Sequence, residues 1–107
     1  MTLAEAQKRV DAWISQFEEG YFSPEVMMLR LAEEVGELAR EIAHDTGAKP
    51  KKPTEAESSV ALELGDVLFV VISLANSLGI DLTEAFLAVM AKFETRDRQR
   101  WTRKTDS

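Results

Sequence analysis

The strongest constraint on the fold is a long apolar stretch that runs from Val60 to Ile80 and carries only two charged residues, Glu63 and Asp66. A β-strand rarely exceeds about ten residues, so this length predicts a helix, although the segment 67–72 is rich in β-branched residues. A transmembrane helix needs about 20 consecutive apolar residues, whereas the uninterrupted apolar part spans only 67–72. A helix that is apolar on nearly all sides must be covered by other helices or by a second subunit.

Glycine, proline and capping residues divide the chain into four predicted helices, over residues 3–17, 24–44, 54–78 and 81–93. Three of the predicted starts carry capping signals, namely Ser23 before Pro24, Thr54 with Glu57, and Asp81 with Glu84. The polar segment 45–53 contains two prolines and is predicted to be a loop. Short connections favour antiparallel neighbours, so we predict an all-α, four-helix bundle-like domain.

Composition limits the chemistry that the chain can perform. With 107 residues it forms one domain over 1–107, without room for a second core. The chain contains no cysteine and one histidine, His44. Disulfide scaffolds, cysteine-bound metals, thiol nucleophiles and sites built on several histidines are therefore excluded.

Charge is distributed unevenly along the chain. The net charge is −6, which disfavours a partner that is a nucleic-acid polymer. Residues 92–107 hold six basic and three acidic side chains, whereas residues 1–91 hold seven basic and sixteen acidic ones. This pattern suits a protein that binds a metal cation beside an anion; a solvated basic tail from about residue 95 is the alternative. The charged N-terminus lacks the apolar core of a signal peptide, so we expect a cytoplasmic protein without a membrane partner.

Acidic residues gather on the second predicted helix, beside its apolar stripe. The stripe consists of Met28, Leu31, Val35, Leu38 and Ile42. At about 100° per residue, Glu34, Glu37 and Glu41 lie together on the flank of this stripe, with Glu33 further round. Like charges at this spacing repel one another, although taken singly these residues are also compatible with an exposed, solvated surface.

Glu63 and Asp66 lie at i and i+3, on one face of the apolar helix. A carboxylate in apolar surroundings costs several kcal/mol unless it is protonated, paired with a base or bound to a cation. Oxygen donors from two neighbouring helices suit Mg²⁺, with Mn²⁺ as the alternative. The acids of the two helices therefore predict a shared metal site.

The spacing of these acids is similar to a known family motif. EExxE from Glu33 to Glu37 is followed, after twenty-five residues, by ExxD from Glu63 to Asp66. This pair resembles the motif of the MazG-like all-α nucleoside triphosphate pyrophosphohydrolases. The likeness covers about residues 21–101 and includes the words RLAEEVGEL, ELGDVLF and KFETR.

The resemblance implies a Mg²⁺-dependent enzyme that cleaves a nucleoside triphosphate or deoxynucleoside triphosphate between its α and β phosphates. The products would be the monophosphate and pyrophosphate, and the role would be house-cleaning of the nucleotide pool. The metal ligands implied are Glu34, Glu37, Glu63 and Asp66. Glu33 would position or deprotonate the attacking water. The number of metal ions, the base, the sugar, and the choice between canonical and damaged nucleotides stay open.

Four further residues are candidates for substrate contacts. Lys92 and Arg96, at i and i+4, are expected to contact the departing pyrophosphate, a role that the resemblance supports. Trp13 can stack on a base or, like Phe17, belong to the core, and the resemblance implies that its helix helps to wall the base pocket. Asn76 can bind the ligand or cap the end of its helix.

Two structural expectations complete the prediction. Because the apolar helix needs covering, we expect a homo-oligomer, either a dimer or a tetramer, whose partner subunit completes the pocket. Glu41 and His44 are interpreted as a surface pair. The alternative functions are a related phosphoribosyl-ATP-type pyrophosphohydrolase and a non-catalytic, metal-binding helical assembly module.

Overall fold

The computed structural model describes residues 1–47 and 59–105. The described residues form four helices and contain no strand, which confirms the all-α prediction. The helices are α1 (Leu3–Ile14), α2 (Pro24–Asp45), α3 (Val60–Ser77) and α4 (Leu82–Thr95). The predicted loop lies largely outside the described residues, and so does the predicted cap formed by Thr54 and Glu57.

Side-chain caps define where each helix begins. Ser23 and Asp81 cap α2 and α4 as predicted, since their oxygens accept hydrogen bonds from backbone amides of the first turn. The described α3 begins after Ser59, whose hydroxyl accepts from the Leu62 amide at 3.1 Å. α1 ends three residues earlier than predicted because the chain tightens into a turn, in which the Phe17 amide donates to the Ile14 carbonyl.

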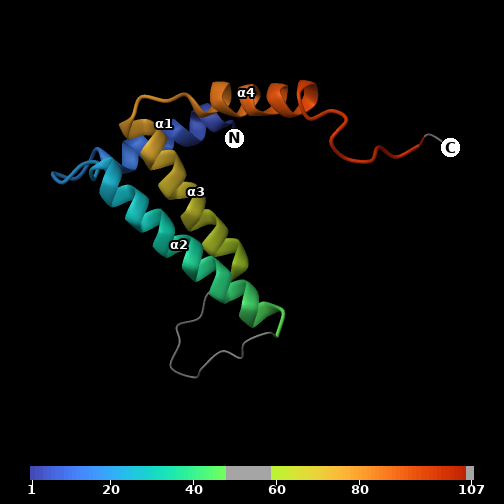
Figure 1. The fold of residues 1–107 in the computed structure, drawn as a ribbon. Coiled ribbons are helices and arrows are strands. Elements are labelled where there is room, and N and C mark those ends of the chain that lie inside the picture. The colour runs from blue at the N-terminus through green and yellow to red at the C-terminus, as the bar shows by residue number, and fades with distance from the viewer. Residues whose placement is uncertain (48–58, 106–107) are drawn as a thin grey trace.

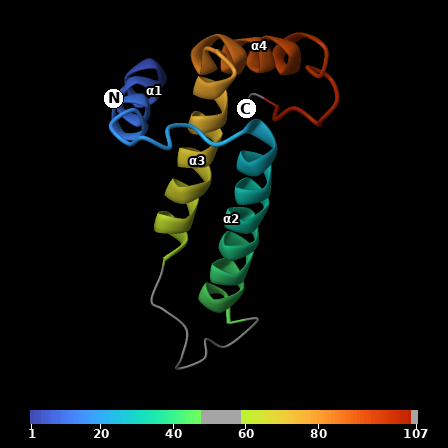
Figure 2. The ribbon, with the colours of Figure 1, turned by 90° about the vertical axis from the view of Figure 1, so that its left-hand side faces the viewer.

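The four helices do not close into a bundle within one chain. α2 and α3 form an antiparallel pair, and α1 lies across the C-terminal half of α3 (Figures 1 and 2). α4 extends away from the pair and packs chiefly against α1. The radius of gyration is 17.8 Å, compared with about 13 Å for a compact domain of this length. A single chain therefore leaves much of its helical surface uncovered.

The buried core is small and centres on α3, which packs against α2 on one side and α1 on another. Its apolar members are Met27, Val70, Ile72 and Ala75. The apolar stripe of α2 contributes little to it, since Met28, Val35 and Ile42 are 52%, 48% and 44% exposed. α2 instead turns its neighbouring, partly acidic face toward α3. By length and composition alone α3 could cross a membrane, but it carries Glu63 and Asp66 and packs against α1 and α2.

Candidate active site

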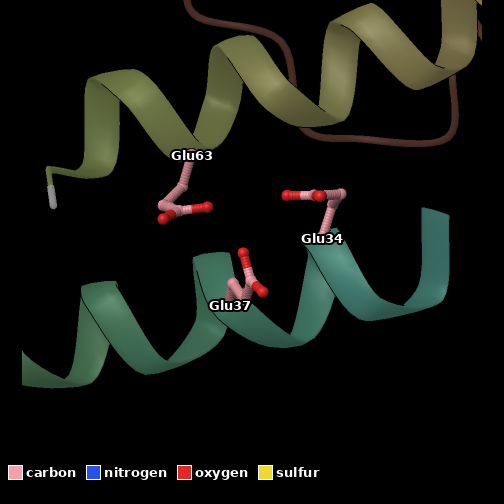
Figure 3. A group of neighbouring side chains, drawn as sticks. All are labelled: Glu34, Glu37 and Glu63. Carbon is pink, nitrogen blue, oxygen red and sulfur yellow. The ribbon is translucent and has the colours of Figure 1, made fainter. Parts of the chain in front are cut away.

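Three carboxylates meet between α2 and α3. Glu34 and Glu37 project from α2 toward α3, and Glu63 projects from the first turn of α3 toward α2 (Figure 3). One oxygen of each lies within 4.8 Å of the corresponding oxygens of the other two. We call Glu34, Glu37 and Glu63 the carboxylate cluster. The prediction that acids of both helices face one another is confirmed for these three residues.

The surroundings of the cluster disfavour negative charge. Glu63 is 8% exposed. The pKa of Glu34 is raised, first by burial and then by repulsion from Glu37, Asp66 and Glu63. One carboxylate oxygen of Glu34, Oε2, is buried and has no hydrogen-bond partner among the described residues. A cation at this position would offset the repulsion between the carboxylates and would give Glu34 Oε2 a partner.

The donor set fits a divalent ion. Mg²⁺ binds oxygen ligands at about 2.1 Å, so two ligands on opposite sides of one ion lie about 4.2 Å apart. The oxygens of the cluster, within 4.8 Å of one another, need only small side-chain adjustments to reach this spacing. Hard carboxylate ligands also favour Mg²⁺ or Mn²⁺ over softer metals. The cluster can therefore hold a divalent cation.

The other two predicted acids lie beside the cluster. Asp66 is exposed, one turn along α3 from Glu63, and its charge contributes to the raised pKa of Glu34. Glu33 is exposed on α2, next to Glu34. Both have room to contact water and a bound molecule. Their predicted roles, as a metal ligand and as the residue that acts on water, stay predictions.

An aromatic cavity of about 310 Å³ opens at the other end of the α2–α3 pair. Its walls come from α1, the connector over residues 15–23, α2 and α3. The lining includes Trp13, Phe17, Tyr21, Phe22, Met27, Arg30 and Ser73. Trp13 and Phe17 are 56% and 48% exposed and pack edge to face, with ring centroids 5.1 Å apart. Both rings are thus half-exposed members of a cavity wall rather than core residues.

The cavity and the carboxylate cluster share one face of α2. Met27, Arg30, Glu34 and Glu37 follow at i, i+3, i+7 and i+10, which places them along a single stripe. Met27 and Arg30 line the cavity, and Glu34 and Glu37 belong to the cluster. A rise of 1.5 Å per residue puts Met27 about 10 Å from Glu34 along the helix. The two sites therefore lie in line along one face of α2.

Sequence reasoning missed several of the cavity residues. Met27 and Ser73 were not singled out, although each lies on the same helical face as the acids of its own helix, and that periodicity was the available signal. Arg30 lies on the acidic face as well, and its guanidinium carbon is 5.8 Å from the centroid of the Phe22 ring. Arg30 therefore contacts the cavity wall, one turn before the cluster.

The basic candidates lie away from the cluster. α4 follows the C-terminal end of α3, whereas Glu63 is in the first turn of α3, about 20 Å away along the helix axis. Arg96 forms a bidentate ion pair with Asp97, with both distances 2.9 Å. The Lys92 ammonium lies 5.4 Å from the centroid of the Phe93 ring. One chain does not bring these residues to its own carboxylate cluster.

Three other residues considered in the sequence, Asn76, Glu41 and His44, contact neighbouring side chains. The Asn76 side chain exchanges hydrogen bonds with Gln7 and donates one to Tyr21, at 2.9 to 3.1 Å. His44 and Glu41, interpreted as a surface pair, have side chains only 5% and 13% exposed, with the nearest ring nitrogen and oxygen 3.9 Å apart. The interpretation as a surface pair was wrong, because both side chains lie on the acidic face of α2, which packs inward and shields them from solvent.

Comparison with known proteins identifies the family. The model of the MazG nucleotide pyrophosphohydrolase domain matches residues 22–101. The chain belongs to the MazG nucleotide pyrophosphohydrolase family. The MazG match includes both groups of acids, the α2 and α3 walls of the cavity and all of α4. The protein is accordingly a hydrolase of the class that acts on acid anhydrides.

Individual relatives are similar to this chain over most of its length. YpjD of Bacillus subtilis (strain 168) is 59% identical over 98% of this chain and 95% of its own length. A dATP/dGTP diphosphohydrolase of Cyanophage S-2L is 37% identical, over 84% of this chain and 71% of its own. The crystal structure of YPJD from Bacillus subtilis gives a TM-score of 0.80 at 58% identity, covering 89% of this chain and 97% of that one.

A second solved structure extends the likeness to the whole chain. The Bacillus-conserved MazG protein, a nucleotide pyrophosphohydrolase, matches with a TM-score of 0.75 at 51% identity. That match covers 100% of this chain and 97% of the other. The open arrangement of four helices is thus a MazG-type fold.

Proposed function

We propose that the protein hydrolyses a nucleoside triphosphate or deoxynucleoside triphosphate to the monophosphate and pyrophosphate, with Mg²⁺ as the cofactor. Its role would be the removal of unwanted nucleotides from the pool. One observation carries the proposal: a single face of α2 joins an aromatic cavity to a carboxylate cluster about 10 Å further along the helix. In a nucleotide one sugar ring joins a flat base, which can stack on aromatic rings, to the phosphates. This order of groups matches an aromatic cavity followed by a carboxylate cluster.

Each of the two sites suits one end of the nucleotide. Trp13, Phe17 and Phe22 offer half-exposed ring faces and edges for a base. Phosphates and carboxylates repel one another, so a triphosphate can approach Glu34, Glu37 and Glu63 only together with cations. Bound Mg²⁺ would neutralise the phosphate oxygens and lower the pKa of a coordinated water.

The chain's own residues would position the metal ions and the attacking water and would accept the proton of that water. Glu34, Glu37 and Glu63 would hold the ions, with Asp66 as the fourth ligand, one turn away on α3. Glu33 is exposed beside Glu34, where its carboxylate would orient the attacking water and accept its proton. No histidine or nucleophilic side chain is required.

We also propose a homo-oligomer, at least a dimer, with a tetramer as the larger alternative. Large apolar side chains on three helices are exposed in one chain, among them Val35 on α2, Leu64 on α3 and Phe86 on α4. A soluble monomer rarely leaves so much apolar surface uncovered. Lys92 and Arg96 lie far from their own chain's cluster, so a partner subunit is the better source of their contact with pyrophosphate.

The direct test is a panel of ribo-, deoxy- and modified nucleoside triphosphates with Mg²⁺, scored for pyrophosphate against phosphate. dATP and dGTP belong at the head of the panel, because the Cyanophage S-2L relative is a diphosphohydrolase of these two nucleotides. We expect pyrophosphate and the monophosphate in equal amounts. Phosphate as the product would contradict cleavage between the α and β phosphates.

Matched variants separate catalysis from folding. Glu63→Gln keeps the shape of the side chain but removes one charge from the cluster, and should lower hydrolysis at least 100-fold. Glu94→Gln makes the same chemical change at an exposed position on α4 and should leave the rate unchanged. Wild-type hydrolysis by a folded Glu63→Gln protein would favour a non-catalytic metal-binding module. Activity confined to phosphoribosyl-ATP would favour the other alternative.

A further inference from the structure

The connector between α1 and α2 forms a large part of the aromatic cavity. Five of the lining residues belong to it, namely Phe17, Glu19, Gly20, Tyr21 and Phe22. Its backbone hydrogen bonds are short-range: the Phe17 amide donates to Ile14 and the Gly20 amide to Phe17, both at 3.2 Å. These bonds shape the turn but do not attach it to α3, which forms the opposite wall.

Tyr21 makes the attachment through its hydroxyl group. The hydroxyl donates to Asp11 Oδ1 on α1 at 2.6 Å and accepts a hydrogen bond from Asn76 Nδ2 on α3 at 3.1 Å. A distance of 2.6 Å is typical of a hydroxyl that donates to a charged carboxylate, which is the stronger kind of hydrogen bond. Burial, and then the bond to Asp11, raise the pKa of Tyr21, so the hydroxyl keeps its proton at neutral pH.

Asn76 is itself held in place by Gln7. The Gln7 side-chain amide donates to Asn76 Oδ1, and Asn76 Nδ2 donates to the Gln7 carbonyl, both at 2.9 Å. Both amide hydrogens of Asn76 are thus committed, one to Gln7 and one to Tyr21. Gln7 also donates to the Ile80 carbonyl and accepts from the Leu82 amide. The Tyr21 network (Gln7, Asp11, Tyr21 and Asn76) therefore links α1, the connector, α3 and the start of α4.

We propose that Tyr21 is a positioning residue for base recognition: the hydrogen bonds of its hydroxyl hold the connector against α1 and α3 and so set the width of the aromatic cavity. Within this network Asn76 positions Tyr21 and does not contact the nucleotide. The inference rests on the proposed function, because it treats the cavity as the base site. A displaced connector would weaken contacts that are equal in the ground and transition states, which raises KM and leaves kcat unchanged.

The experiment compares Tyr21→Phe, which removes only the hydroxyl, with two variants of its acceptor. Asp11→Asn keeps an oxygen that can accept from the phenol, whereas Asp11→Ala does not. Thr95→Val removes a hydroxyl that donates to the Ala91 carbonyl on α4 and serves as the matched control. Kinetics are measured with the nucleotide that the wild-type protein hydrolyses best and with its poorer competitors, and amide hydrogen exchange is followed at Phe17 and Gly20.

We expect Tyr21→Phe and Asp11→Ala to raise KM for the best nucleotide about tenfold, with kcat within twofold of wild type. Discrimination between bases should fall by a similar factor, and Phe17 and Gly20 should exchange about tenfold faster. Asp11→Asn and Thr95→Val should behave like the wild-type protein. An unchanged KM would overturn the proposal, whether or not exchange accelerates, and so would a parallel fall in kcat. If the wild-type protein hydrolyses no nucleotide, the proposed function fails, and unchanged exchange in Tyr21→Phe would then also refute the positioning role.

Discussion

Replacing Glu34 by glutamine should have opposite effects on stability with and without metal. In the metal-free protein Glu34 lies within 4.8 Å of Glu37 and Glu63. Coulomb's law at that distance gives about 0.9 kcal/mol per pair at the dielectric constant of water and about 3.5 kcal/mol at an effective value of 20. Because Glu37 is exposed to water, the lower figure is the better guide. Two such pairs make Glu34→Gln more stable by about 2 kcal/mol.

The pH dependence of this gain follows from the raised pKa of Glu34. The folded protein keeps the Glu34 proton to a higher pH than the unfolded chain does. The stability that comes from the neutral form is therefore complete below the unfolded pKa and is lost as the pH rises through the folded pKa. The wild-type protein and Glu34→Gln should be equally stable in acid, and the variant should become the more stable one as the pH rises.

Mg²⁺ should make the wild-type protein more stable than Glu34→Gln. A ligand present at one hundred times its dissociation constant stabilises a folded protein by about 2.7 kcal/mol, which exceeds the advantage of about 2 kcal/mol that the metal-free variant holds, and the glutamine variant should lose most of this gain. Thermal unfolding at fixed protein concentration measures both effects, since 1 kcal/mol shifts the Tm of a domain of this size by about 4–8 °C. Glu94→Gln is the control and should follow the wild-type protein. A metal-free Glu34→Gln that is less stable than wild type, or an equal response of both proteins to Mg²⁺, would refute the assignment.

Four further outcomes test other parts of the structure. Trp13→Ala should raise KM about tenfold at constant kcat, since stacking on a base contributes about 1–3 kcal/mol, and steady-state kinetics would show it. Met27→Ala, at a position 3% exposed, should lower the free energy of unfolding in urea by about 2–4 kcal/mol. Thr2→Val should bring the lowered pKa of Glu5 only part of the way back toward its ordinary value in an NMR titration, because it removes the Thr2 hydroxyl but keeps the Thr2 amide, the larger of the two causes of the shift. The stability that the wild-type protein gains from the hydrogen bonds of the Glu5 carboxylate is lost as the pH falls through the pKa of Glu5 in the folded protein. Light scattering should give an oligomer, and Val35→Asp should shift it toward the monomer; a monomeric wild-type protein with full activity would contradict the expected assembly.

The apolar stripe of α2 shows where sequence reasoning reached its limit. Periodicity correctly located both the stripe and the acids on its flank, about 110° apart around the helix. It could not tell which of the two faces meets α3, because both faces are continuous over the whole helix. In the structure the face with Met27 and Glu34 packs inward, and the stripe with Met28 and Val35 is left half-exposed.

The sequence by itself determined the helices and the chemistry of their acids. Caps such as Ser23 and Asp81 act over three residues, and motif spacing acts over one or two turns, so both can be recognised within a short window. Only the tertiary structure decided that the Asn76 side chain forms hydrogen bonds with Gln7 and Tyr21, which are 69 and 55 positions away in the chain. It also decided that Lys92 lies at the far end of α3 from Glu63. Such contacts depend on how whole helices cross, and no local pattern of side chains records that.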